Sequence, residues 1–180
     1  MSVFEDALNH ILDRVEDSCR SVSKDSVKEI AEIIAKSPRI FVYGSGRSGV
    51  IGKCFATRLV QIGKTAYFIG ESTTPIIKKE DSVVLISNTG KTKSTILVAS
   101  ISRNLGAETI CLTSSPDNPL AKICNKKLII KYSNINPDYA PLGTVFEISS
   151  LIILDSLIAE LMKILGENEQ SMRGRHAIWA

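Results

Sequence analysis

Short apolar segments alternate with helical patterns along this chain, and that alternation restricts its fold more than any other feature. The apolar segments run almost without interruption, as SVVLIS at residues 82–87 illustrates. Such segments are typical of strands in a parallel sheet that helices cover on both faces. The expected strands are residues 39–43, 65–69, 82–87, 108–112 and 127–131.

Helical patterns occupy the intervals between these strands. Apolar residues recur at three-and-four spacing in two stretches within residues 3–36, and Pro38 ends the second, because a residue before proline disfavours the α conformation. Further helices are expected at residues 47–62, 92–105, 119–123 and 144–165. The pattern predicts a three-layer, doubly wound α/β fold. It has a five-stranded parallel sheet, two extra N-terminal helices and a C-terminal tail.

The length of 180 residues is sufficient for one domain with a sizeable core. No internal repeat, low-complexity stretch or linker divides the chain, so we expect a single domain over residues 1–180. Within it, residues 1–37 hold the N-terminal helices, residues 38–166 the α/β core and residues 167–180 the tail.

The charge and the apolar runs of the chain argue against two kinds of partner, nucleic acid and membrane. The net charge is only +3 and the basic residues are scattered, so the short run RGRH at residues 173–176 is expected to be a solvated tail. The longest apolar run, residues 151–154, is far shorter than a membrane span, and Phe4-Glu5-Asp6 interrupts any apolar leader. We therefore expect a cytoplasmic protein that binds neither nucleic acid nor membrane.

The cysteines form no C-x-x-C pair and have no histidine at zinc-site spacing, so neither a metal site nor a disulfide framework is expected. They are interpreted as small buried side chains in a reducing compartment. The four are Cys19, Cys54, Cys111 and Cys124.

Two loops follow expected strands at the carboxyl edge of the sheet, where folds of this kind bind ligands. The first, GSGRSG at residues 44–49, matches the G-x-G-x-x-G pattern of dinucleotide sites, and Glu71 could hold a ribose. The second, SNTGKTKS at residues 87–94, places four hydroxyl groups around Gly90 at a helix start. Capping a helix needs one hydroxyl, and a terminal phosphate monoester uses several. The second loop therefore favours a phosphate monoester over a dinucleotide.

The two loops together resemble those of the sugar isomerase (SIS) domain family. The matching residues are Gly44, Gly46 and Ser48 in the first loop and Ser87, Thr89, Gly90 and Thr92 in the second. Four segments are similar to the 6-phospho-3-hexuloisomerase family: FVYGSGRSGVIGKCFATRL, FIGESTTPIIKKED, YAPLGTVFE and RGRHAIWA. The resemblance extends from about residue 38 to the end of the chain.

The resemblance implies an enzyme without a cofactor or metal. It would interconvert D-arabino-3-hexulose 6-phosphate and D-fructose 6-phosphate through a 2,3-enediol(ate). The pathway would be the ribulose monophosphate route of formaldehyde fixation or its reverse, alongside 3-hexulose-6-phosphate synthase. A homotetramer is implied as well. It agrees with the expected helix at residues 144–165, which is apolar almost all round and needs a partner subunit to cover it.

The resemblance also assigns roles to individual residues. Arg47 would lie over the sugar, Glu147 would be the catalytic base, and His176 would assist ring opening or carry protons, in its own or a neighbouring subunit's site. The residues expected to bind the substrate and its phosphate are Gly46, Ser48, Ser87, Thr89, Gly90 and Thr92.

Several alternatives stay open at this point. Thr144 and Glu147 form a T-x-x-E capping box, in which the carboxylate would only cap the last long helix. Lys91 could stabilise an enediolate in place of Arg47, and the local sequence around His176 is that of a surface residue. At the level of function, the alternatives are another sugar-phosphate isomerase and a non-catalytic module that senses sugar phosphates.

Overall fold

A five-stranded, all-parallel sheet forms the middle layer of the molecule. The computed structural model describes residues 2–176 of the 180. The sheet has the order β2-β1-β3-β4-β5 and every neighbouring pair is parallel. Its strands are β1 (Arg39–Gly44), β2 (Thr65–Phe68), β3 (Ser82–Ile86), β4 (Glu108–Thr113) and β5 (Lys126–Ile129).

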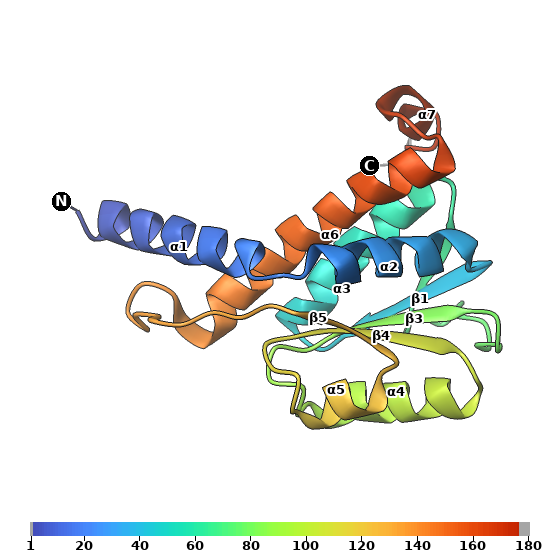
Figure 1. The fold of residues 1–180 in the computed structure, drawn as a ribbon, viewed down its shortest axis with the longest axis horizontal. Coiled ribbons are helices and arrows are strands. Elements are labelled where there is room, and N and C mark those ends of the chain that lie inside the picture. Colours follow the sequence, from blue (N-terminus) through green and yellow to red (C-terminus); the bar gives the residue numbers. More distant parts are fainter. Residues whose placement is uncertain (1, 177–180) are drawn as a thin grey trace.

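Helices cover both faces of this sheet (Figure 1). One face carries α2 (Lys24–Lys36), α3 (Arg47–Gln61) and α6 (Thr144–Leu165), and the other carries α4 (Lys93–Asn104) and α5 (Pro119–Ile123). Helix α1 (Val3–Arg20) packs against α6 and extends beyond the sheet. A 3-10 turn (Pro141–Gly143) precedes α6, and α7 (Glu169–Arg173) follows it.

Alternate residues of the central strands fill two separate cores. Val84 and Ile86 of β3 face the layer of α2, α3 and α6, whereas Val83 and Leu85 face α4 and α5, because successive side chains of a strand point to opposite faces. All four side chains are buried. This two-sided burial explains why the strands have apolar sequences without polar alternation.

The predicted α/β architecture is confirmed, and the helices expected at residues 119–123 and 144–165 have those bounds. The strand expected at residues 127–131 is β5 (Lys126–Ile129) instead, because its ladder with β4 begins with the Ile110–Lys126 pair. The apolar sequence continues past that ladder. Helix α7 was not predicted, since its five residues carry no apolar periodicity.

Two other expectations concern the burial of the cysteines and the length of the apolar helices. Cys111 and Cys124 are buried and Cys19 is half-buried, but the expectation of burial is wrong for Cys54, which lies on the outer face of α3. No helix between residues 2 and 176 combines the length and the apolar character that crossing a membrane requires.

The strand order places the two glycine-containing loops side by side. From β1 the chain proceeds through α3 to β2 at one edge, and β3 then pairs with the other side of β1 and leads to β4 and β5. Because β1 and β3 are adjacent and parallel, the loops after them leave the same edge of the sheet. Ligands of open α/β sheets bind at this kind of switch point.

Candidate active site

A cavity of about 200 Å³ opens where β1 and β3 end. It is smaller than the roughly 300–1,000 Å³ of sites for drug-sized ligands, so it suits a small molecule. The structure brings five of the residues selected from the sequence into this cavity. Its lining consists of Ser45, Ser48, Ile86, Ser87, Asn88, Thr89, Thr92, Leu142 and Glu147.

The first loop brings the start of α3 directly against the end of β1. A Cβ on Gly44 would lie 2.7 Å from the carbonyl oxygen of Ser48, and a Cβ on Gly49 would lie 2.6 Å from that of Gly44. Only glycine permits such an approach. It places Ser48 at the cavity, and Gly46, the N-cap of α3, adds no side chain that would cover the first N–H groups.

The second loop presents its hydroxyl groups to the cavity instead of capping α4. Thr92 is the N-cap of α4, but its side chain makes no capping hydrogen bond. Its Oγ1 lies 3.3 Å from Oγ of Ser87. The Oγ1 of Thr89 accepts a hydrogen bond from the N–H of Lys91 at 3.3 Å, while the Lys91 side chain is not part of the cavity lining. The N-capping interpretation of this loop is therefore wrong.

Gly90 lets the second loop pack against α5. It is buried with φ +61°, and any Cβ at that position would collide with the side-chain amide of Asn118. The N–H of Leu120 donates to the carbonyl oxygen of Gly90 at 3.1 Å. Gly90 thus shapes the loop, and its neighbours supply the hydroxyl groups.

Glu147 faces the cavity from the first turn of α6. The N-cap of this helix is Gly143, and the hydroxyl of Thr144 donates to the carbonyl oxygen of Pro141 at 2.6 Å. The Glu147 carboxylate accepts a hydrogen bond from Nε of Arg47 at 2.5 Å. The capping box is therefore not formed, because the helix begins one residue earlier than that pattern requires.

The electrostatic character of the cavity suits an anion beside a single carboxylate. Helices α3 and α4 both begin at the cavity, and neither has a side-chain cap at its N-terminus. Unpaired N–H groups at the start of a helix attract phosphate. The Glu147 side chain is only 12% exposed, whereas that of Arg47 is 72% exposed and lies at the rim. Arg47 is thus positioned to approach a bound ligand from solvent.

The dinucleotide interpretation has little support from this geometry. Glu71, the candidate ribose ligand, pairs with Nζ of Lys53 at 3.3 Å and does not line the cavity. Gly44 and Gly49 are required for the contact between β1 and α3. A bound pyrophosphate is therefore not needed to explain these glycines.

His176 lies near the end of α3, whereas Glu147 contacts Arg47 at the start of that helix. The neighbouring Arg175 donates to the carbonyl oxygen of Gln61 at 3.2 Å, where α3 ends, and Arg47 is at the start of that helix. The 15 residues of α3 span about 20 Å. The structure therefore does not bring His176 to Glu147 within one chain. Residues 177–180, the rest of the tail, lie outside the described residues.

Arg175 attaches the tail through a bidentate ion pair. Its two terminal nitrogens donate to the carboxylate of Glu167 at 2.8 and 2.9 Å. Together with the hydroxyl of Ser171, this pair lowers the pKa of Glu167 from the ordinary 4.5 to about 2. The expectation of a purely solvated tail is wrong for Arg175, because this side chain contacts both Glu167 and α3.

We expect acid to release this attachment. Because the folded-state pKa of Glu167 lies below its ordinary value, the ion pair stabilises the fold above about pH 4.5 and is lost as the pH falls toward 2. An NMR titration should find the Glu167 carboxyl near pH 2 in the wild type and clearly higher in Arg175→Met. Arg173→Met, which removes only the pair with Glu169, is the matched control. Titration of wild-type Glu167 near 4.5 would contradict the attachment.

Besides Ile86 at the end of β3, three residues of the cavity were not among those selected from the sequence. Ser45 and Asn88 lie inside the two loops, so a reading of every polar side chain in those loops would have found them. Leu142 has no local signal. It is 99% exposed and adopts φ +54°, and only the path of the chain into α6 places it at the cavity.

Comparison with known proteins identifies the family of this chain. Residues 33–157 match the model of the SIS domain, and they include every cavity residue. The chain belongs to the SIS domain family.

The similarity to several relatives in this family covers most of this chain. A 3-hexulose-6-phosphate isomerase of Methanocaldococcus jannaschii is 36% identical over 85% of this chain and 83% of its own. Another, of Bacillus subtilis, is 32% identical over 93% and 94% of the two chains. A crystal structure from Methanococcus jannaschii, from which the same function was inferred, has a TM-score of 0.85 at 34% identity and covers 94% of this chain and 98% of its own.

Proposed function

We propose that this SIS protein is a 3-hexulose-6-phosphate isomerase, also called 6-phospho-3-hexuloisomerase. It interconverts D-arabino-3-hexulose 6-phosphate and D-fructose 6-phosphate. The observation that carries the proposal is the position of Glu147, a single carboxylate in the same cavity as the hydroxyl groups of both loops. The relatives from Methanocaldococcus and Bacillus support this choice of substrate pair.

The reaction moves a carbonyl group between C2 and C3 of a six-carbon ketose phosphate. Glu147 removes the proton from C3 of fructose 6-phosphate, and the 2,3-enediolate that results takes up a proton at C2 while the hydroxyl proton passes between the two oxygens. A positioned carboxylate typically contributes ~10²–10⁴-fold to such a step. The guanidinium of Arg47, which contacts Glu147 in this structure, stabilises the negative charge of the enediolate.

The hydroxyl groups of Ser48, Ser87, Thr89 and Thr92 bind the terminal phosphate together with the starts of α3 and α4. Replacing Ser87 and Thr92 together by alanine should raise KM for fructose 6-phosphate at least tenfold and change kcat little. The reason is that the phosphate is bound similarly in the ground state and the transition state. Steady-state kinetics measures both constants. Ser94→Ala, in the first turn of α4 but outside the cavity lining, is the control.

The active site is shared between subunits of a homo-oligomer, in which His176 reaches the cavity of a neighbouring chain. Two observations support this proposal. His176 lies about the length of α3 away from the cavity of its own chain. Helix α1, which extends beyond the sheet, also leaves an exposed apolar stripe made of Phe4, Leu8 and Leu12, and such stripes are usually covered by a partner. The expected assembly is a tetramer built as a dimer of dimers.

Proton NMR of the purified protein with fructose 6-phosphate in D₂O tests the function directly. A 2,3-enediolate intermediate exchanges the C3 proton of fructose 6-phosphate for deuterium and produces signals of the 3-hexulose. An aldose–ketose isomerase would label C1 instead, and a sensor module would label neither carbon. Addition of 3-hexulose-6-phosphate synthase should then release formaldehyde, as expected for a cytoplasmic enzyme of the ribulose monophosphate pathway or its reverse. Absence of label at C3 would contradict the proposal.

A further inference from the structure

Asn88 is held in place from two neighbouring strands of the sheet. Its carbonyl oxygen accepts hydrogen bonds from the hydroxyl of Thr113 at 2.9 Å, and from the hydroxyl and N–H of Ser114 at 2.8 and 3.0 Å. Its side-chain Oδ1 accepts a hydrogen bond from the hydroxyl of Tyr132 at 2.9 Å. Tyr132 follows β5, so the ends of β4 and β5 together determine both the backbone and the side chain of Asn88.

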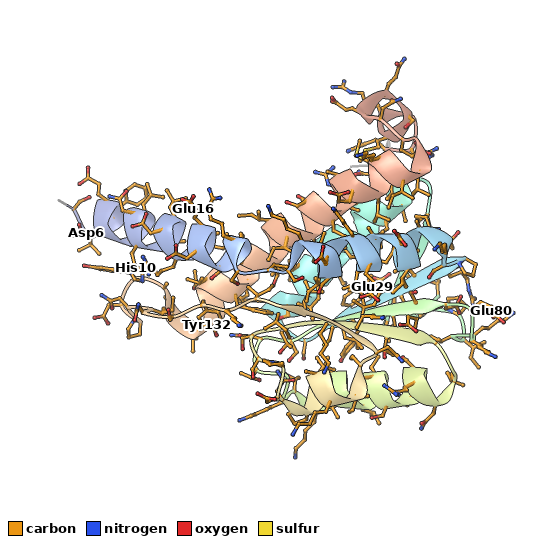
Figure 2. The ribbon with its side chains drawn as sticks, viewed as in Figure 1. Asp6, His10, Glu16, Glu29, Glu80 and Tyr132 are labelled. Atoms are coloured by element: carbon orange, nitrogen blue, oxygen red, sulfur yellow. The ribbon has the colours of Figure 1, made fainter. Side chains whose placement is uncertain are left out.

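The other side of the Asn88 amide lies against the start of α6. Its Nδ2 is 2.8 Å from the point that a Cβ on Gly143 would occupy, and Gly143 is the N-cap of α6 with φ +94°. Tyr132 packs in the same apolar cluster as Val145 of α6, and Figure 2 shows it close to the start of that helix. The Asn88 side chain therefore lies between the backbone of the loop at residues 87–94 and the start of α6, and leaves no room there for a Cβ on Gly143.

This contact joins the two halves of the proposed site. Ser87 and Thr89, the neighbours of Asn88 in sequence, line the phosphate side of the cavity, and Glu147 lies one turn beyond Gly143. In a ketose 6-phosphate the chain between C3 and C6 limits how far the reacting carbons can lie from the phosphate. The base can remove the proton only if its distance from the phosphate loop is also set, since small misplacements cost large factors in rate.

We propose that Asn88 and Tyr132 are a positioning pair that sets the distance between the phosphate loop and Glu147. The inference rests on the proposed function. The hydroxyl of Tyr132 acts through Asn88, because it donates to the Asn88 amide and Tyr132 does not line the cavity. The hydrogen bond selects one of the two orientations that the torsion of an asparagine amide otherwise allows.

The test is a double-mutant cycle on kcat and KM for fructose 6-phosphate. Tyr132→Phe should lower kcat about tenfold, which corresponds to the loss of one hydrogen bond. KM and the inhibition constant of inorganic phosphate should stay within about twofold, since the phosphate hydroxyls are untouched. Asn88→Ala should cost more, and Asn88→Ala with Tyr132→Phe should be no slower than Asn88→Ala alone. Tyr139→Phe, in the same loop but with its ring against His10, should behave as the wild type.

Each outcome decides the inference. A Tyr132→Phe variant with wild-type kcat overturns it. Additive effects of the two substitutions overturn it as well, and so does a loss of kcat/KM that comes entirely from a higher KM. If the wild type itself is inactive, the proposed function fails, and NMR of the protein with inorganic phosphate tests the pair separately. The side-chain amide signals of Asn88 and the backbone signals of Gly143 and Glu147 should then shift in Tyr132→Phe and not in Tyr139→Phe. Unchanged signals overturn the pairing.

Discussion

Replacing Glu147 by glutamine should lower kcat by two to four orders of magnitude, in line with the ~10²–10⁴-fold contribution of a general base. Glutamine keeps the shape of the side chain and can still accept the hydrogen bond from Nε of Arg47. It cannot take a proton from carbon. The melting temperature and the binding of fructose 6-phosphate should therefore change little, because neither the fold nor the phosphate hydroxyls depend on the charge. Kinetics, calorimetry and ligand titration measure the three quantities.

Glu160→Gln is the matched control for this experiment. It makes the same chemical change on the same helix, but far from the cavity, in the groove between α6 and the N-terminal helices. Its kcat should equal that of the wild type. Activity of Glu147→Gln within threefold of the wild type would mean that the carboxylate only holds Arg47, and the base would then have to be another residue.

Co-expression of Glu147→Gln and His176→Ala chains should restore activity that neither variant has alone. If His176 serves the cavity of a neighbouring chain, some sites of the mixed oligomer combine an intact Glu147 from one variant with an intact His176 from the other. Random pairing of equal amounts leaves about a quarter of the sites intact in a symmetric assembly. The expected activity is thus about a quarter of the wild-type value, a gain of at least tenfold over either variant. A spectrophotometric assay of the purified mixture measures it.

Two controls accompany the mixing experiment. Co-expression of Glu147→Gln with Glu147→Ala contains no intact base and should stay inactive. Light scattering should show a homo-oligomer at micromolar concentration, because the apolar stripe of α1 would otherwise remain exposed. Mixed oligomers as inactive as their parents, or a monomer in light scattering, would contradict the shared site.

The sequence alone determined the class of fold and half of the candidate site. Near-continuous apolar strands between helices indicate a parallel sheet, since strands buried on both faces lack polar alternation. The rule that ligands bind at the carboxyl edge of such a sheet then selects the loops at residues 44–49 and 87–94. Ser48, Ser87, Thr89 and Thr92 were found in this way because each lies within a few residues of a strand end, where local pattern is informative.

Tertiary structure alone decided what connects segments that are distant in sequence. The residues Thr144 and Glu147 read as a capping box, and only the turn before α6, which makes Gly143 the N-cap, releases the carboxylate to contact Arg47. The contacts of Asn88 with Tyr132 and Gly143 depend on three chain segments meeting at one edge of the sheet. The separation of His176 from Glu147 depends on the lengths of α3 and α6. These relations are long-range packing, which local sequence patterns do not encode.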